Sequence, residues 1–142
     1  MALQLSVFLQ NKSGRIATIT KALYEAGIDI RALSIADTTD FGILRMLVSD
    51  VQKAKEALAK QNCIVSINEV TVVAVPDKPG SLSKILDLLA QGNVDIEYMY
   101  SIFAHGETDA YMVFRVSDGK CLNAVLSENG ISTVPAEKLG LF

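Results

Sequence analysis

The feature that most constrains this chain is an internal duplication. Residues 10–16, QNKSGRI, align with residues 76–82, PDKPGSL, 66 positions later, and Leu23 falls on Leu89 at the same spacing. Each segment places a polar, glycine-containing turn shortly before an apolar residue. Similarity at a fixed spacing is the sequence signature of a repeated structural unit.

The match extends through the rest of both copies. After an insertion of two residues near His105, the spacing becomes 68. The further corresponding segments are Ala26-Gly27 with Gly92-Asn93, Ile28-Asp29-Ile30 with Val94-Asp95-Ile96, Val48-Ser49-Asp50 with Val116-Ser117-Asp118, and Leu58 with Leu126. We therefore predict two domains, residues 1–68 and 69–142. No flexible linker is expected, because residues 70–75 are apolar and β-rich rather than rich in glycine and serine.

Within each copy the hydrophobic period changes in the same order, and this order predicts the fold. In the first copy we expect strands at 3–7, 28–36, 42–48 and 64–67, a helix from Ile16 ended by Gly27, a turn at 37–41, and a helix from Val51 capped by Asp50. In the second copy we expect strands at 70–75, 94–103, 110–116 and 131–134, and helices at 82–90 and 122–126. The predicted class is α+β, with two tandem ferredoxin-like βαββαβ units whose helices cover one face of an antiparallel sheet.

Size and charge restrict the partners. A single unit of this length buries only about 60% of its unfolded surface, so we expect units to pair, within the chain or in a homodimer. The net charge of −3 gives no basic surface for nucleic acid or an anionic membrane. No apolar run approaches the ~20 residues of a membrane span, and the N-terminus is unlike a signal peptide, so a cytoplasmic protein is expected. Cys63 and Cys121 are interpreted as reduced thiols.

Residues for catalysis are scarce. The sequence lacks the common nucleophile, metal and phosphate motifs, so we expect no enzyme activity, metal or cofactor. The single histidine, His105, lies in an expected turn, as a solvated residue or as a ligand contact. The acidic pairs in the two equivalent turns are interpreted as turn residues; they are Asp37 with Asp40 and Glu107 with Asp109.

Two apolar features allow more than one interpretation. Tyr98, Tyr100 and Phe103 form an aromatic stripe, which we interpret as buried or interfacial because no basic face accompanies it, as RNA binding would require. The C-terminal tail, residues 135–142, is apolar enough to dock on the chain's own sheet or on a partner. Self-docking is the preferred interpretation.

The segments that indicate function are the two polar turns before the first helix of each copy. A glycine there lets the backbone approach a ligand, and the free N–H groups of the helix start can hold a carboxylate. Alternatively, Ser13 and Ser81 cap their own helices, and Lys12 and Lys78 are merely solvated.

Both turns resemble the Asp/Asn-x-x-Gly-x-Leu/Ile signature of ACT domains, and a Gly/Asn-Val/Ile-Asp-Ile strand start follows at the right distance. The resemblance covers the whole chain twice. It implies that an amino acid binds between the turn of one unit and the second-strand start of its neighbour. One implied site comprises Asn11, Ser13, Gly14, Arg15 and Ile16 with Asn93, Val94, Asp95 and Ile96. The other comprises Asp77, Pro79, Gly80, Ser81 and Leu82 with Gly27, Ile28, Asp29 and Ile30.

The two implied sites differ chemically, because Asn11, Ser13 and Arg15 stand where the other has Asp77, Pro79 and Ser81. They therefore either discriminate between ligands or include one unused site. From the resemblance we expect a non-enzymatic regulatory protein that binds a free amino acid. The alternative is a protein-interaction module, a regulatory subunit of an amino-acid biosynthetic enzyme with no ligand of its own.

Overall fold

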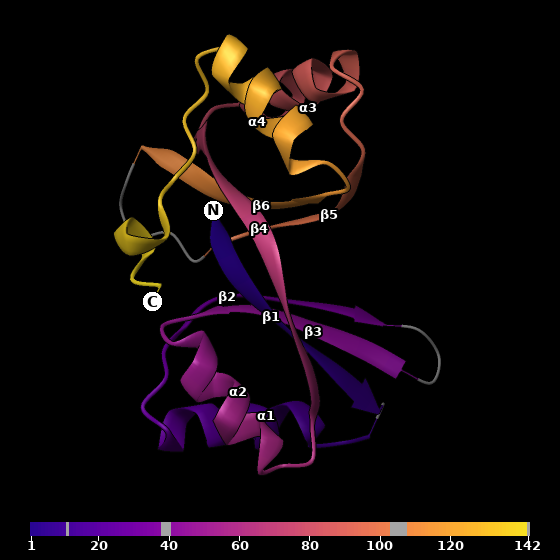
Figure 1. Cartoon of the computed structure of the whole chain (residues 1–142), viewed down its shortest axis with the longest axis vertical. Coiled ribbons are helices and arrows are strands. Elements are labelled where there is room, and N and C mark those ends of the chain that lie inside the picture. The colour runs from indigo at the N-terminus through magenta and orange to yellow at the C-terminus, as the bar shows by residue number, and fades with distance from the viewer. Residues whose placement is uncertain (11, 38–40, 103–107, 142) are drawn as a thin grey trace. The chain divides into compact units, whose positions relative to one another are not determined.

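The structure, a computed structural model, describes residues 1–10, 12–37, 41–102 and 108–141 (Figure 1). The chain divides into two compact units. Leu3–Asn68 and Ala136–Phe142 make up the first unit, and Glu69–Pro135 and Met1–Ala2 make up the second unit. Each terminal segment thus groups with the copy that is distant from it in sequence. Each unit has its own hydrophobic core.

The first unit has the predicted order of elements. They are β1 (Ala2–Gln10), α1 (Arg15–Glu25), β2 (Ile30–Asp37), β3 (Phe41–Val48), α2 (Val51–Ala59) and the start of β4 (Ile64–Pro76). The strand order is β2-β3-β1-β4. Both described pairs, β1 with β3 and β2 with β3, are antiparallel.

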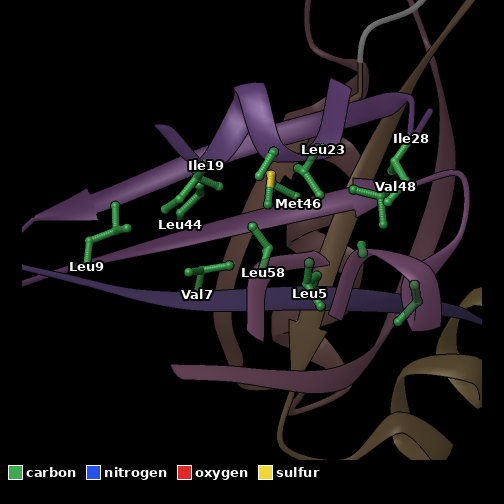
Figure 2. Close-up of a cluster of buried hydrophobic side chains, with 13 residues drawn as sticks. Leu5, Val7, Leu9, Ile19, Leu23, Ile28, Leu44, Met46, Val48 and Leu58 are labelled. Carbon is green, nitrogen blue, oxygen red and sulfur yellow. The ribbon is translucent and has the colours of Figure 1, made fainter. Parts of the chain in front are cut away.

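The core of the first unit lies between the helices and one face of the strands. Leu5, Val7 and Leu9 alternate along β1 and are buried, as the period of two requires. Figure 2 shows these side chains facing Ile19 of α1 and Leu58 of α2. The amphipathic helices thus cover a single face, as predicted.

The second unit repeats this arrangement. It contains the remainder of β4, then α3 (Ser81–Gln91), β5 (Ile96–Ser101), β6 (Asp109–Val116) and α4 (Gly119–Glu128). The strand order is β4-β6-β5, with antiparallel pairs. The repeated α+β, ferredoxin-like pattern is confirmed.

Two details of the predicted strands are wrong. The strands expected at 64–67 and 70–75 form one continuous strand, β4. The strand expected at 131–134 is reduced to an isolated bridge between Val73 and Thr133. This segment is short, and Pro135 follows it directly without an N–H for a further ladder bond.

The polar turns of the two units have matching backbone hydrogen bonds. Lys12 N donates to Gln10 O and Lys78 N to Pro76 O, both at 2.8 Å. The predicted cap at α2 is confirmed, because the Asp50 carboxylate accepts from Lys53 N at 3.0 Å. The polar turns before α1 and α3 therefore begin with the same backbone hydrogen bond.

The C-terminal tail packs within the first unit. It contains a short 3₁₀ helix, η1 (Ala136–Leu139), and Leu141 is only 5% exposed. A Cβ added at Gly140 would lie 2.9 Å from the guanidinium of Arg31 in β2. The preferred interpretation of the tail, docking on the chain itself, matches this packing.

The remaining structural predictions concern the cysteines and membrane segments. Cys63 and Cys121 are free thiols, each packed beside the core of its unit. Among the described helices, none is both long and apolar enough to cross a membrane. His105, Phe103, Asp40 and Glu107 lie outside the described residues.

Candidate functional site

The two polar turns end at glycines with left-handed backbone. Gly14 has φ 80° and Gly80 has φ 88°, and each is the N-cap of the helix that follows. This region of φ favours glycine, so the backbone conformation of the turn explains the residue without a ligand. A Cβ at either position would meet no atom within 4 Å. The backbone at each turn is therefore open to an approaching molecule.

The alternative in which Ser13 and Ser81 cap the helices is wrong. The N-caps are the two glycines, neither helix has a side-chain cap, and Ser81 is the first residue of α3. In α1 the N–H groups of Ile16 and Ala17 donate to no described residue. These orphan donors, together with the positive end of the helix dipole, suit a carboxylate.

The second strand of each unit is preceded by a residue with positive φ and then by a buried apolar residue. Gly27 and Asn93 have positive φ and follow the ends of α1 and α3. Ile28 and Val94 pack in the cores of their units, so most of each side chain is withdrawn from a ligand. Sequence reasoning named these positions without distinguishing side chain from backbone.

The two aspartates at these strand starts differ in their pairing. The Asp29 carboxylate lies 3.3 Å from the guanidinium of Arg31. Asp95 forms no ion pair with any described residue, and its backbone O accepts from Ser117 N at 3.4 Å. Asp95 therefore has a carboxylate free to meet a ligand's ammonium group.

No unit by itself brings a turn and a second-strand start together. In the first unit they lie at opposite ends of α1, which spans Arg15–Glu25 and is therefore roughly 16 Å long. The same holds for α3, Ser81–Gln91, in the second unit. The implied sites combine residues of paired units, and their assembly stays a prediction. Asn11 lies outside the described residues.

The structure adds neighbours that the sequence analysis did not name. Thr20 and Tyr24 border a shallow, open depression of the surface beside the second-strand start of the first unit, residues 27–30. Tyr24 is 80% exposed. The available signal was the spacing of four residues between Thr20 and Tyr24, which places them on one helix face.

A family model described as ACT domain pair matches residues 1–141. The chain belongs to the ACT domain pair family. The predicted resemblance is thereby confirmed over nearly the whole length. No match is found among curated proteins.

Solved structures also resemble this ACT domain pair. Protein BT0572 from Bacteroides thetaiotaomicron is 42% identical, with 99% of this chain and 96% of that chain covered and a TM-score of 0.88. The ligand-free regulatory subunit of aspartate kinase from Thermus thermophilus is 18% identical, with 90% of both chains covered and a TM-score of 0.68. The aspartate kinase of Clostridium acetobutylicum is 16% identical, with 92% of this chain and 33% of that chain covered and a TM-score of 0.56. The latter two show the fold.

Proposed function

We propose that this ACT domain pair is a non-enzymatic regulatory protein that binds a free amino acid. The ligand would bind between the polar turn of one unit and the second-strand start of a paired unit. The observation that carries this proposal is the repeated turn with a left-handed glycine N-cap. Each turn exposes backbone donors at a helix start and leaves open space above the glycine.

The chemistry of the segments suits a zwitterion. The α-carboxylate would bind the orphan N–H groups at the start of α1, where the helix dipole contributes about 0.3–1 kcal/mol. The α-ammonium group would bind the carboxylate of Asp95, which has no ion pair among the described residues. In the pseudo-symmetric arrangement Asp29 is already paired with Arg31. We therefore favour the site that combines Gly14 with Asp95.

Regulation would follow from the two-unit architecture. A ligand that bridges two units shifts their equilibrium only if it binds one arrangement more tightly than the other. The regulatory subunits of aspartate kinase share this fold, which supports a role beside an enzyme. A homodimer would provide a further pair of units.

A thermal-shift screen of the full chain against the twenty amino acids tests the proposal. At about one hundred times its dissociation constant, a ligand adds ~2.7 kcal/mol of stability, or roughly 5–11 °C in Tm. We expect a shift from one amino acid or one chemical group of them. A flat screen would contradict amino-acid binding and favour the interaction module, which co-purification of one enzyme would then identify.

Matched variants locate the site by calorimetric titration of the amino acid found. Asp95→Asn removes the charge that would hold the ammonium group, so affinity should fall about tenfold or more. Asp29→Asn is the matched control, because its carboxylate is already paired, and it should leave affinity within about twofold. Gly14→Asn fills the open space with a residue that tolerates positive φ, and binding should be lost. Unchanged affinity in both Asp95→Asn and Gly14→Asn would show that the site is elsewhere.

A further inference from the structure

Each unit has a β-bulge at the start of its second strand. In β2 the pairing with β3 shifts around Arg31, which is the extra residue of the bulge. In β5 the pairing with β6 shifts around Glu97, which stands 66 positions later and is the matching residue. Both strands lie at an edge of the sheet. Bulges at sheet edges redirect side chains and are common beside functional sites. The bulge residue of each unit is therefore placed to act on the second-strand start just before it.

The two bulge residues differ in charge and in partner. The Nη1 atom of Arg31 lies 3.3 Å from Oδ2 of Asp29, two residues earlier in the chain. Glu97 pairs with Arg115 of β6 instead, at 3.3 Å between Oε2 and Nε. Asp95, which matches Asp29, is left without an ion pair among the described residues. The pairing of Asp29 thus depends on the residue at the bulge and is not a property of the shared fold.

The C-terminal tail covers Arg31. Gly140 lies against the guanidinium, because a Cβ built on this glycine would be 2.9 Å from Nη2 and 3.4 Å from Nε of Arg31. The Nε atom is buried there and has no hydrogen-bond partner, although the side chain as a whole is 41% exposed. A buried N–H group without an acceptor is unfavourable. The guanidinium therefore keeps this position through its packing against Gly140 and its pairing with Asp29.

The tail is closed by its own hydrogen bonds. Leu141 N donates to Ala136 O and Gly140 N donates to Glu137 O, both at 3.1 Å, and Gly140 has φ 70°. These are the two hydrogen bonds and the left-handed glycine of a Schellman motif. Leu141 is buried, but no hydrogen bond or ion pair of the described residues joins residues 136–141 to β2. The tail can therefore separate from Arg31 as a folded piece without breaking a polar contact between them.

We propose that residues 136–141 form a strap that controls the availability of Asp29 by positioning Arg31. With the strap in place, Arg31 occupies the carboxylate of Asp29. With the strap displaced, the guanidinium is free to turn to solvent, and Asp29 can receive the ammonium group of an amino acid. An amino acid that binds only to the released carboxylate shifts the equilibrium toward the displaced strap.

This inference rests on the proposed function, and it assigns a control to one of the two pseudo-symmetric sites. The strap acts on the site that combines residues 77–82 with residues 27–30. Arg31 is a positioning residue there, because it acts on the ligand only through Asp29. The other site is under no such control, since the matching Glu97 pairs with Arg115 and leaves Asp95 available.

Solvent exchange of the Arg31 Nε proton, measured by NMR on the full chain, tests whether the strap covers this residue. Leu141→Ser removes the buried side chain of the tail, so the exchange should accelerate about tenfold or more. Lys138→Ser changes an exposed residue of the same tail and should leave the rate within about twofold. An unchanged rate in Leu141→Ser would overturn the proposal. If that variant fails to fold, Gly140→Val takes its place, because its side chain would meet the guanidinium.

Titration of the full chain with each of the twenty L-amino acids at millimolar concentrations tests the control of binding. The backbone amides of Asp29 and Ile30 report on the site in NMR spectra. Leu141→Ser and Arg31→Gln should each lower the dissociation constant about threefold to fivefold, as the release of a partly exposed ion pair allows. Both changes act through the same guanidinium, so the double variant should gain no more than either single variant. Additive gains would overturn the route through Arg31.

The deaminated analogue of the amino acid that binds best separates this role from a general change of structure. The analogue keeps the carboxylate and the side chain but has no ammonium group for Asp29. Its dissociation constant should therefore agree within about twofold among the unsubstituted protein, Leu141→Ser and Arg31→Gln. Amino-acid affinity that is equal in these three proteins would overturn the strap alone. Absence of amino-acid binding in all three would overturn the proposed function together with this inference.

Discussion

The two units have the same backbone conformation around the polar turn, but they carry different side chains there. The turn, the left-handed glycine and the helix start have matching hydrogen bonds in both, such as Thr18 N to Gly14 O and Lys84 N to Gly80 O, each at 3.0 Å. Beside this turn the first unit has a crevice of about 360 Å³ that Arg15 bridges, and the matching crevice of the second unit, of about 490 Å³, has Ser81 at that position. Duplication thus retains the frame while the side chains change its chemistry. The units should therefore respond alike to changes in the frame and differently to changes in the crevices.

The largest effect tests whether the cores are equivalent. Leu58→Ala in α2 and Leu126→Ala in α4 remove matching, fully buried side chains. Each should lower the free energy of unfolding by about 2–5 kcal/mol, through lost burial and the cavity left behind. Chemical denaturation measures the loss, and hydrogen exchange assigns it to a unit. A cost confined to one variant would show that only one core determines stability.

Removal of the helix caps should cost less stability than removal of core side chains, and the cost should differ between the units. The Asp118 carboxylate accepts from both Lys120 N and Cys121 N, at 3.0 and 3.2 Å, whereas Asp50 accepts only from Lys53 N. Replacement of either by alanine should cost about 0.5–2 kcal/mol, with Asp118→Ala the more costly. Thermal unfolding of the two variants side by side measures this order. The reverse order would mean that the second hydrogen bond adds nothing.

The turn glycines should respond equally. Gly14→Ala and Gly80→Ala each force a Cβ into left-handed backbone, at a cost of roughly 1 kcal/mol. The corresponding asparagine variants should lose less, because asparagine tolerates this conformation. Denaturant titration of the four variants checks both statements. Because a Cβ at either glycine meets open space, a much larger loss would contradict the described turns.

The smallest effect on stability comes from opening the first crevice. Arg15 is a surface residue whose long contacts to Gln61 O and Cys63 Sγ contribute little, so Arg15→Ser should change stability by no more than about 0.5 kcal/mol. A crystal structure of this variant should nevertheless show a larger crevice in the first unit. An unchanged crevice would mean that other side chains close it.

Local patterns sufficed to predict most of the fold, and long-range contacts explain the errors. The alternation of Leu5, Val7 and Leu9 indicated the face of β1 that packs in the core, although Gln4 and Ser6 of the other face are buried as well. Asp50 was recognisable as a cap from its position alone. The polar middle of β4 suggested a break between strands. There, however, Ser6 Oγ donates to Asn68 Oδ1 at 2.9 Å and Arg115 Nη1 donates to Glu69 O at 2.8 Å. These partners are distant in sequence and satisfy the polar groups within a continuous strand.

The candidate site was predictable only in part for the same reason. The glycines of the turns indicated a left-handed backbone conformation, because few other residues adopt it. The burial of Ile28 and Val94 depends on packing that a motif does not contain. The crevices depend on contacts such as that between Arg15 and Gln61, which are 46 positions apart. A single sequence carries no signal for such pairs.

The continuous strand β4 limits how the length of this chain can change. Residues 64–68 of the strand belong to the first unit and 69–76 to the second, and side chains along a strand alternate between two faces. Insertion of one residue between Asn68 and Glu69 would reverse the alternation on one side of the insertion, and only a bulge could absorb it. Insertion of two residues would preserve the alternation. At this position, insertions of an even number of residues should therefore be tolerated better than insertions of an odd number.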